Sequence, residues 1–277
     1  MRSRWWALTA SWIISVGLAA GPGVAQEPGQ ADVAVQGRPL SGWTAEATIG
    51  RDSYLSDAST WRPWSAAELL VARRFDWGSI GVGAVEVKRF DRRDGARSLD
   101  IYGRLWPGAF GNLRGAVATT AVVLPTTDLS AELFQGVQGG WEPSVAIRRM
   151  GYGNPVFLSS LSVGKYVGDR WYGRVRGTQA ERGGGGGGSS VSGLVRRYVG
   201  PSREFVEMAA GTGEEAVTAG VTTSNEVVVD IRQTGFLEVG GRKYLTRLLG
   251  ASVSLGYHTF EAIPDRLGLR VGALARF

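Results

Sequence analysis

The sequence predicts an all-β protein, a transmembrane antiparallel up-and-down β-barrel of about fourteen strands preceded by a cleaved signal peptide. Three observations lead to this prediction: residues 267–277 alternate between apolar and polar or small side chains, the amino terminus reads as an export signal, and alternating segments separated by turn residues fill the chain between them. Strands with lipid on one side and a polar lumen on the other need this period of two.

The amino-terminal segment has the composition of a secretory signal. Arg2 and Arg4 precede an apolar stretch at residues 5–20, and small residues follow up to Ala25. This stretch is shorter than the roughly 20 residues that a spanning helix needs. We therefore expect residues 1–25 to be removed on export, residues 26–40 to form a disordered lead-in, and residues 41–277 to form one barrel domain in the cell outer membrane.

Alternation and turn signals place the individual strands. The predicted strands lie near residues 42–50, 64–75, 78–90, 97–106, 110–123, 129–139, 142–150, 156–167, 170–179, 190–199, 202–211, 226–238, 243–257 and 265–277. Single-chain bacterial barrels have an even number of strands. Twelve is the alternative count, because residues 42–50 and 142–150 alternate weakly.

The lengths of the connections predict how the barrel is oriented in the membrane. With the amino terminus in the periplasm, the periplasmic turns lie at residues 76–77, 107–109, 140–141, 168–169, 200–201 and 240–242, and all are short. The longest connections, at residues 51–63, 180–189 and 212–225, then face outward. Aromatic residues near both sets of connections predict two interfacial girdles. The periplasmic girdle comprises Trp43, Phe75, Trp77, Trp106, Phe110, Trp141, Trp171, Tyr198, Phe205, Phe236, Tyr244 and Phe277, and the outer girdle comprises Trp61, Trp64, Phe90, Tyr152, Phe157, Tyr257 and Phe260.

The final predicted strand shows the facing most clearly. Its lipid-facing set is Leu267, Leu269, Val271, Ala273, Ala275 and Phe277, and its lumen set is Gly268, Arg270, Gly272 and Arg276. Phe277 is expected to be the signal that the barrel-assembly machinery reads. The aromatic residue often found three positions from a barrel terminus is replaced here by Ala275.

Composition narrows the chemistry. The 42 glycines suit curved, tilted strands, and the absence of cysteine excludes disulfides and thiolate metal sites. The net charge of +6 comes almost entirely from arginine. Arginine binds phosphates and carboxylates bidentately, so it predicts either contact with lipopolysaccharide or an anionic solute, or pairing with acids of the lumen. Pairing is the more common arrangement. Nucleic-acid binding is not expected, because export separates the chain from nucleic acid.

Charges on the predicted lumen face are the candidate site. They are Glu86, Lys88, Asp100, Arg104, Arg174, Arg176, Arg196, Asp230, Arg232 and Arg270, with Arg276 at the end of the last strand. Such a set either lines a narrow anion-selective path or cross-links the interior. His258 is the single histidine, which leaves a serine hydrolase only as a remote alternative, and we expect it to be hydrogen-bonded at the membrane interface. The glycine tract at residues 183–188 is expected to be a flexible outer tip. No cofactor or metal is expected.

Several segments resemble the YaiO-type outer-membrane β-barrel family. They are residues 73–79 running on to Glu86 and Arg89, 102–110, 165–171, and 196–198 followed by 211–213. The resemblance covers about residues 43–277. It implies a barrel without established enzymatic activity, in a family sometimes joined to helical repeats and associated with cell-surface polysaccharide. This sequence has no such repeats, so that association would be indirect.

The function expected from the sequence is that of a non-enzymatic outer-membrane barrel, acting as a narrow channel or export port for an anionic solute or saccharide. Two alternatives stay open: a structural or adhesive barrel with a closed lumen and partner-binding outer loops, and an interface acyl hydrolase. Outer-membrane lipid and lipopolysaccharide are the expected surroundings.

Overall fold

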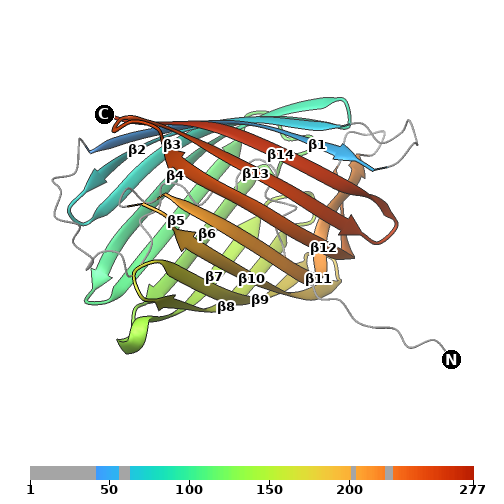
Figure 1. The fold of residues 1–277 in the computed structure, drawn as a ribbon. Helices are drawn as coiled ribbons and strands as arrows, with labels where there is room; N and C mark the ends of the chain where they lie inside the picture. The colour runs from blue at the N-terminus through green and yellow to red at the C-terminus, as the bar shows by residue number, and fades with distance from the viewer. Residues whose placement is uncertain (1–41, 56–62, 201–203, 222–226) are drawn as a thin grey trace.

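The computed structural model describes residues 42–55, 63–200, 204–221 and 227–277, and within these ranges fourteen strands form the protein (Figure 1). The predicted signal peptide and lead-in lie outside the described residues. The strands are β1 (Trp43–Tyr54), β2 (Trp64–Phe75), β3 (Gly78–Arg89), β4 (Arg92–Trp106), β5 (Ala109–Ala118), β6 (Thr127–Gln135), β7 (Trp141–Met150), β8 (Val156–Val167), β9 (Trp171–Arg182), β10 (Gly187–Tyr198), β11 (Phe205–Val221), β12 (Val227–Tyr244), β13 (Leu249–Phe260) and β14 (Ile263–Arg276).

Each strand pairs antiparallel with its neighbours in the chain, and β1 pairs with β14 to close the barrel. The closing register runs from Thr44 opposite Arg276 to Tyr54 opposite Arg266. The fold prediction is therefore confirmed at fourteen strands, and the count of twelve is wrong. Among the described residues, no helix is long and apolar enough to cross a membrane.

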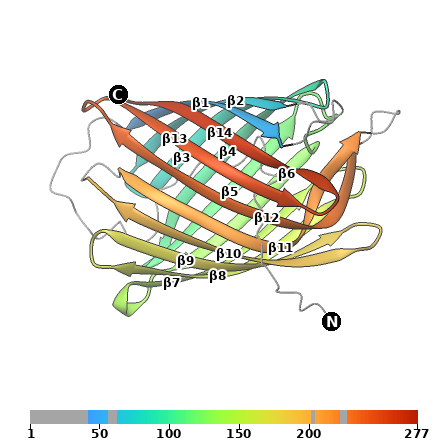
Figure 2. The same cartoon turned by 45° about the vertical axis from the view of Figure 1, so that its right-hand side comes forward.

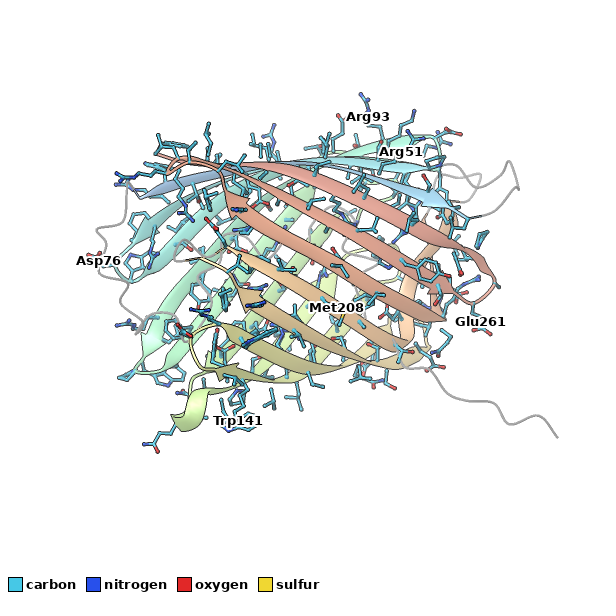
Figure 3. The ribbon with its side chains drawn as sticks, viewed as in Figure 1. Arg51, Asp76, Arg93, Trp141, Met208 and Glu261 are labelled. Atoms are coloured by element: carbon cyan, nitrogen blue, oxygen red, sulfur yellow. The ribbon has the colours of Figure 1, made fainter. Side chains whose placement is uncertain are left out.

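The barrel has two unlike ends. One, called here the turn end, holds Trp43, Phe277 and the connections at residues 76–77, 107–108, 136–140, 168–170, 199–204 and 245–248. The other, the loop end, holds the connections at residues 90–91, 119–126, 151–155, 183–186 and 261–262, together with the facing ends of β1 and β2 and of β11 and β12. Figure 3 shows Asp76 and Trp141 at the turn end and Glu261 at the loop end.

Two predicted connections are wrong. Residues 240–242 lie inside β12, and the chain turns instead at residues 245–248, because β12 and β13 stay paired as far as Tyr244 and Gly250. The predicted outer loop at residues 212–225 is largely strand: β11 and β12 are the longest strands of the barrel. The orange end of β11 bends away from the direction of the other strands at the loop end (Figure 2).

Side chains alternate between lipid and lumen along the strands. On β14, Leu267, Leu269 and Val271 are exposed on the outside, and Arg266 and Leu274 are buried inside, which confirms the facing predicted for the last strand. The exposed apolar residues form the belt that a bilayer requires.

The aromatic girdle at the turn end contains fewer residues than predicted. Trp77, Trp106, Trp141 and Trp171 lie outside, each at least 43% exposed. A second group of predicted girdle residues is buried inside the barrel and is wrongly placed by the prediction: Phe110, Tyr198, Phe205 and Phe236. Proximity to a turn does not decide which face of a strand an aromatic side chain occupies, since adjacent residues point to opposite faces.

Candidate functional site

Ion pairs cross-link the lumen wall. Some join adjacent strands, such as Arg196 with Glu207 at 2.7 Å, and others skip strands, such as Arg176 of β9 with Glu132 of β6. The other inward pairs are Arg148–Asp128 at 2.5 Å, Arg242–Glu46 at 3.1 Å, Arg232–Asp230 at 3.3 Å, Arg266–Asp52 at 3.7 Å, Arg270–Glu238 at 3.7 Å and Arg182–Asp230 at 3.8 Å. Pairs that skip strands brace the wall across its curvature and narrow the space inside.

Most of the predicted lumen charges lie on the inward face of their strands. Those that take part in ion pairs are Arg176, Arg196, Asp230, Arg232 and Arg270. Asp100 accepts a hydrogen bond from the Asn112 amide at 3.1 Å. Arg104 and Arg174 lie on inward positions and form no ion pair with another described residue, which makes them the charges most available to a solute. Arg276 lies over the Tyr244 ring at 3.4 Å.

Glu86 and Lys88 are wrongly placed by the sequence prediction. Both are exposed on the outer face of β3, while Val85 and Val87 between and beside them are buried inside. Val85 and Val87 join a buried apolar cluster around Trp64 inside the loop end. The usual polar-inside pattern is therefore inverted at these two positions, although the next inward residue of the strand, Arg89, is also buried there.

Aromatic rings line the lumen toward the turn end. One cluster consists of Tyr102, Phe110 and Phe134, and a second consists of Tyr172, Tyr198 and Phe205, with Tyr166 and Leu194 packed against it. Because Tyr and Trp rings combine an apolar face with a polar tip, such surfaces suit ligands that are partly apolar and partly polar. The sequence prediction placed three of these rings, Phe110, Tyr198 and Phe205, in the periplasmic girdle.

Polar side chains lie beside the second aromatic cluster. The Tyr172 hydroxyl donates to a Glu142 carboxylate oxygen at 2.9 Å, and Glu142 is only 3% exposed. The Ser144 hydroxyl donates to Glu132 at 2.7 Å and lies 2.6 Å from the Ser162 hydroxyl. Sequence reasoning missed Glu142, although its place on the inward face of β7 could have been counted from Trp141, which is exposed outside.

At the loop end, residues 119–126 fold into the barrel. A single carboxylate oxygen of Asp94 accepts three backbone hydrogen bonds, from Val122 at 2.8 Å, Val123 at 2.5 Å and Leu124 at 2.8 Å. Asp94 is fully buried. Leu124 packs in a cluster that includes Trp64. We call residues 119–126 the inward loop. The sequence predicted strand up to residue 123, whereas β5 ends at Ala118.

A second apolar cluster caps the opposite part of the loop end. Ala216 of β11 and Val229 of β12 pack against Met150 and Val156 from the tips of β7 and β8. The Arg182 guanidinium donates to the Val229 carbonyl at 2.8 Å. The long β11–β12 hairpin thus leans inward, and apolar contacts cover the lumen from two sides.

His258 lies inside the barrel and is 3% exposed, so the prediction of an interface histidine is wrong. Its ring stacks on Phe236 at a centroid distance of 6.1 Å, and its Nδ1 has no hydrogen-bond partner. Ser252 pairs across the sheet with Gly272 and Arg242, well along the strand from the histidine. This arrangement lacks the serine–histidine contact that a hydrolase needs.

The glycine tract forms a tight turn. Gly184, Gly185 and Gly186 adopt φ of 94°, 105° and 92°, a region that favours glycine. The Arg182 amide donates to the Gly186 carbonyl at 2.9 Å. Within the part of the chain that the structure describes, no group of His, Cys, Asp or Glu has the arrangement of a metal site.

Comparisons with known proteins agree with this fold. The model of a family described as the YaiO membrane beta barrel domain matches residues 46–218. A comparison with curated proteins found no match. Among solved structures, a bacterial polysaccharide outer membrane secretin is similar with a TM-score of 0.56 and 11% identity, covering 84% of this chain and 98% of that one.

Two further solved structures resemble the barrel. The CymD monoaromatic hydrocarbon channel has a TM-score of 0.54 and 9% identity, covering 86% of this chain and 89% of that chain. The outer membrane protein Omp33 of Acinetobacter baumannii has a TM-score of 0.52 and 7% identity, covering 87% of this chain and all of the other. At these identities the likeness is one of fold.

Proposed function

Because this chain belongs to the YaiO membrane β-barrel domain family and is an outer-membrane β-barrel, we propose that it is a narrow, gated channel or export port for an anionic solute or a saccharide. The observation that supports this most is the composition of the lumen. Inward arginines and carboxylates run beside two clusters of aromatic rings, and the loop end is covered by a segment held in place by hydrogen bonds.

Arg104 and Arg174 supply the selectivity in this proposal. Neither is neutralised by an ion pair with another described residue, so each contributes a positive charge to the path that a solute would follow. Charged groups in a narrow passage with low-dielectric walls focus the field and raise the local concentration of counter-ions. Anions would therefore be favoured over cations.

The aromatic clusters are the basis for proposing a saccharide as the solute. Their rings offer apolar faces, while Glu142 and Ser144 beside them accept or donate hydrogen bonds. A saccharide presents the same combination of apolar ring faces and hydroxyls. The solved structures of this fold include a bacterial polysaccharide outer membrane secretin, which is a further reason to consider this class of solute.

The alternative is a structural or adhesive barrel with a closed lumen. It is favoured by the two apolar clusters at the loop end, because buried contacts such as Trp64 with Leu124 are those of a permanent core. The catalytic alternative has no comparable support, since Ser252 lies well along the strand from His258.

Conductance in planar bilayers distinguishes a channel from a barrel with a closed lumen. We would compare the refolded barrel with a variant in which residues 120–125 are replaced by two glycines, and use Glu261→Gln as a control at the loop end. A channel gives brief openings in the parent and longer or larger openings in the shortened variant, with reversal potentials that favour anions. Silence in both proteins, with the barrel folded, would contradict the channel and support the closed barrel.

A further inference from the structure

A groove crosses the outer surface of the barrel over β14, β1, β2 and β3. Its floor follows one row of paired residues, Gly272, Thr48, Glu68 and Val85, whose side chains point inward, so the backbone forms the bottom. Its volume of about 610 Å³ lies within the range of about 300–1,000 Å³ that ligand sites occupy.

Apart from Glu86, the side chains that form the walls of the groove are apolar, and half of them are small. The wall nearer the loop end is the outward row Val271, Ile49, Ala67 and Glu86, and the other wall is the row Ala273, Ala47, Leu69 and Ala84. Alanine at four of these eight positions is what leaves room between the rows. In the membrane, the matching occupant of such a groove is an acyl chain.

A basic row lies directly above the groove, one outward position closer to the loop end. Arg51 of β1, Ser65 of β2, Lys88 of β3 and Arg93 of β4 are successive register partners and form a single line across four strands. At about 4.8 Å per strand the three cations span about 14 Å. Figure 3 shows Arg51 and Arg93 projecting from the same side of the barrel.

Positive charge exceeds negative charge along this row. Arg51 and Lys88 form no ion pair with another described residue, and Arg93 pairs only with Glu86 at 3.3 Å, with both side chains more than half exposed. Arg97, the partner of Ala84, adds a further outward cation where the groove reaches β4. Of the exposed acids at this end of the barrel, Glu86 and Asp91 lie beside the row, whereas Glu181, Glu214 and Glu261 lie on other strands or loops.

We propose that the basic row and the groove together bind a phosphorylated glycolipid of the lipopolysaccharide class. Its phosphates contact Arg51, Lys88 and Arg93, and one acyl chain lies along the groove. Arginine and lysine bind phosphate strongly, and juxtamembrane cations attract anionic lipid headgroups. The site requires the loop end to face the cell exterior, where this lipid is found, and it is independent of whether the lumen conducts.

The test uses the refolded barrel in detergent micelles, with lipid retention measured by native mass spectrometry. The probes are diphosphorylated lipid A, the same lipid after enzymatic dephosphorylation, and phosphatidylglycerol. The parent barrel should retain the phosphorylated glycolipid at least tenfold more strongly than either of the other probes.

Two variants test the two halves of the site. The triple variant Arg51→Ala, Lys88→Ala, Arg93→Ala removes the basic row, and its matched control Arg149→Ala, Lys165→Ala, Arg197→Ala removes the same residue types from other outward positions. Ala67→Trp fills the groove, and Ala210→Trp, on the outward face of β11, is its control. Each site variant should lower retention of lipid A at least tenfold, and neither control should.

Heat-dependent electrophoretic mobility identifies the folded barrels, so that only these are compared. Equal losses in the triple variant and its control would overturn the basic row as a site. Retention that survives dephosphorylation, or equal retention of phosphatidylglycerol, would overturn the assignment to a phosphorylated glycolipid. Unchanged retention in Ala67→Trp would overturn the acyl-chain groove.

Discussion

Replacing Asp94 with alanine should release the inward loop from the loop-end mouth. In the parent protein one buried carboxylate oxygen accepts the amides of Val122, Val123 and Leu124 at 2.5–2.8 Å. The alanine variant removes all three acceptor contacts at once and leaves three amides without their partner. The strands of the wall do not depend on these bonds, so the effect should be local.

The magnitude follows from the hydrogen bonds that are lost. A hydrogen bond to a charged group contributes about 1.5–3 kcal/mol. The three donors share one oxygen and act as a unit, so their contributions do not simply add. A loss of about 3–5 kcal/mol from the closed state is therefore expected. Since 1.4 kcal/mol is a factor of ten, the lower figure corresponds to about a 100-fold increase in the population of open loop.

Hydrogen–deuterium exchange of the barrel in nanodiscs measures this population directly. The amides at residues 122–124 should exchange about 100-fold faster in Asp94→Ala, and by a smaller factor in Asp94→Asn, which keeps one amide oxygen as an acceptor. Asp100→Asn is the control, because Asp100 lies on the same strand and accepts from Asn112. Unchanged protection at residues 122–124 in the alanine variant would refute the claim that Asp94 holds the inward loop in place, whatever happens to conductance.

Further predictions concern the wall and the lumen. Val271→Arg places a charge in the lipid belt and should lower the free energy of unfolding, measured with urea in vesicles, by about 2–4 kcal/mol. Gly272→Arg should also be less stable than the parent, because a Cβ there would lie 2.4 Å from the Ser252 hydroxyl oxygen. Stability equal to that of the parent would contradict this packing. Neutralising Arg104 and Arg174 together should shift the reversal potential toward cations, less so at high salt, since screening acts over about 10 Å at 0.1 M. Arg176→Gln should instead lower the free energy of unfolding by about 1–3 kcal/mol, because Glu132 loses its cation. If calorimetry shows that the Arg104 and Arg174 double variant loses more stability than Arg176→Gln, the assignment of Arg176 to a structural ion pair is refuted.

The number and order of the strands could be predicted because each strand carries its own signal. Alternation with a period of two, interrupted by glycine, proline and aspartate, is a local pattern, and neighbours in an up-and-down barrel are also neighbours in sequence. The same reasoning gave the facing of β14, where large apolar residues and arginines alternate.

The interior of the loop end could not be predicted, because contacts distant in sequence determine it. Asp94 binds a segment about thirty residues away, and no local pattern marks residues 119–123 as anything but a continued strand. Once that loop enters the lumen, Val85 and Val87 must face inward to meet it. The facing of Glu86 and Lys88 therefore depends on a loop whose position inside the lumen no local sequence pattern indicates.

The seam between β1 and β14 has a consequence for the order of assembly. Trp43 and Phe277 exchange two backbone hydrogen bonds at 3.2 Å, and eleven register pairs follow between strands that are separated by most of the sequence. Every other strand can pair with the one made just before it, whereas β1 keeps one edge unpaired until β14 is available. Unpaired edges recruit other strands, and distant pairings form slowly. During biogenesis, the first strand of this barrel must therefore be shielded by something other than its own fold.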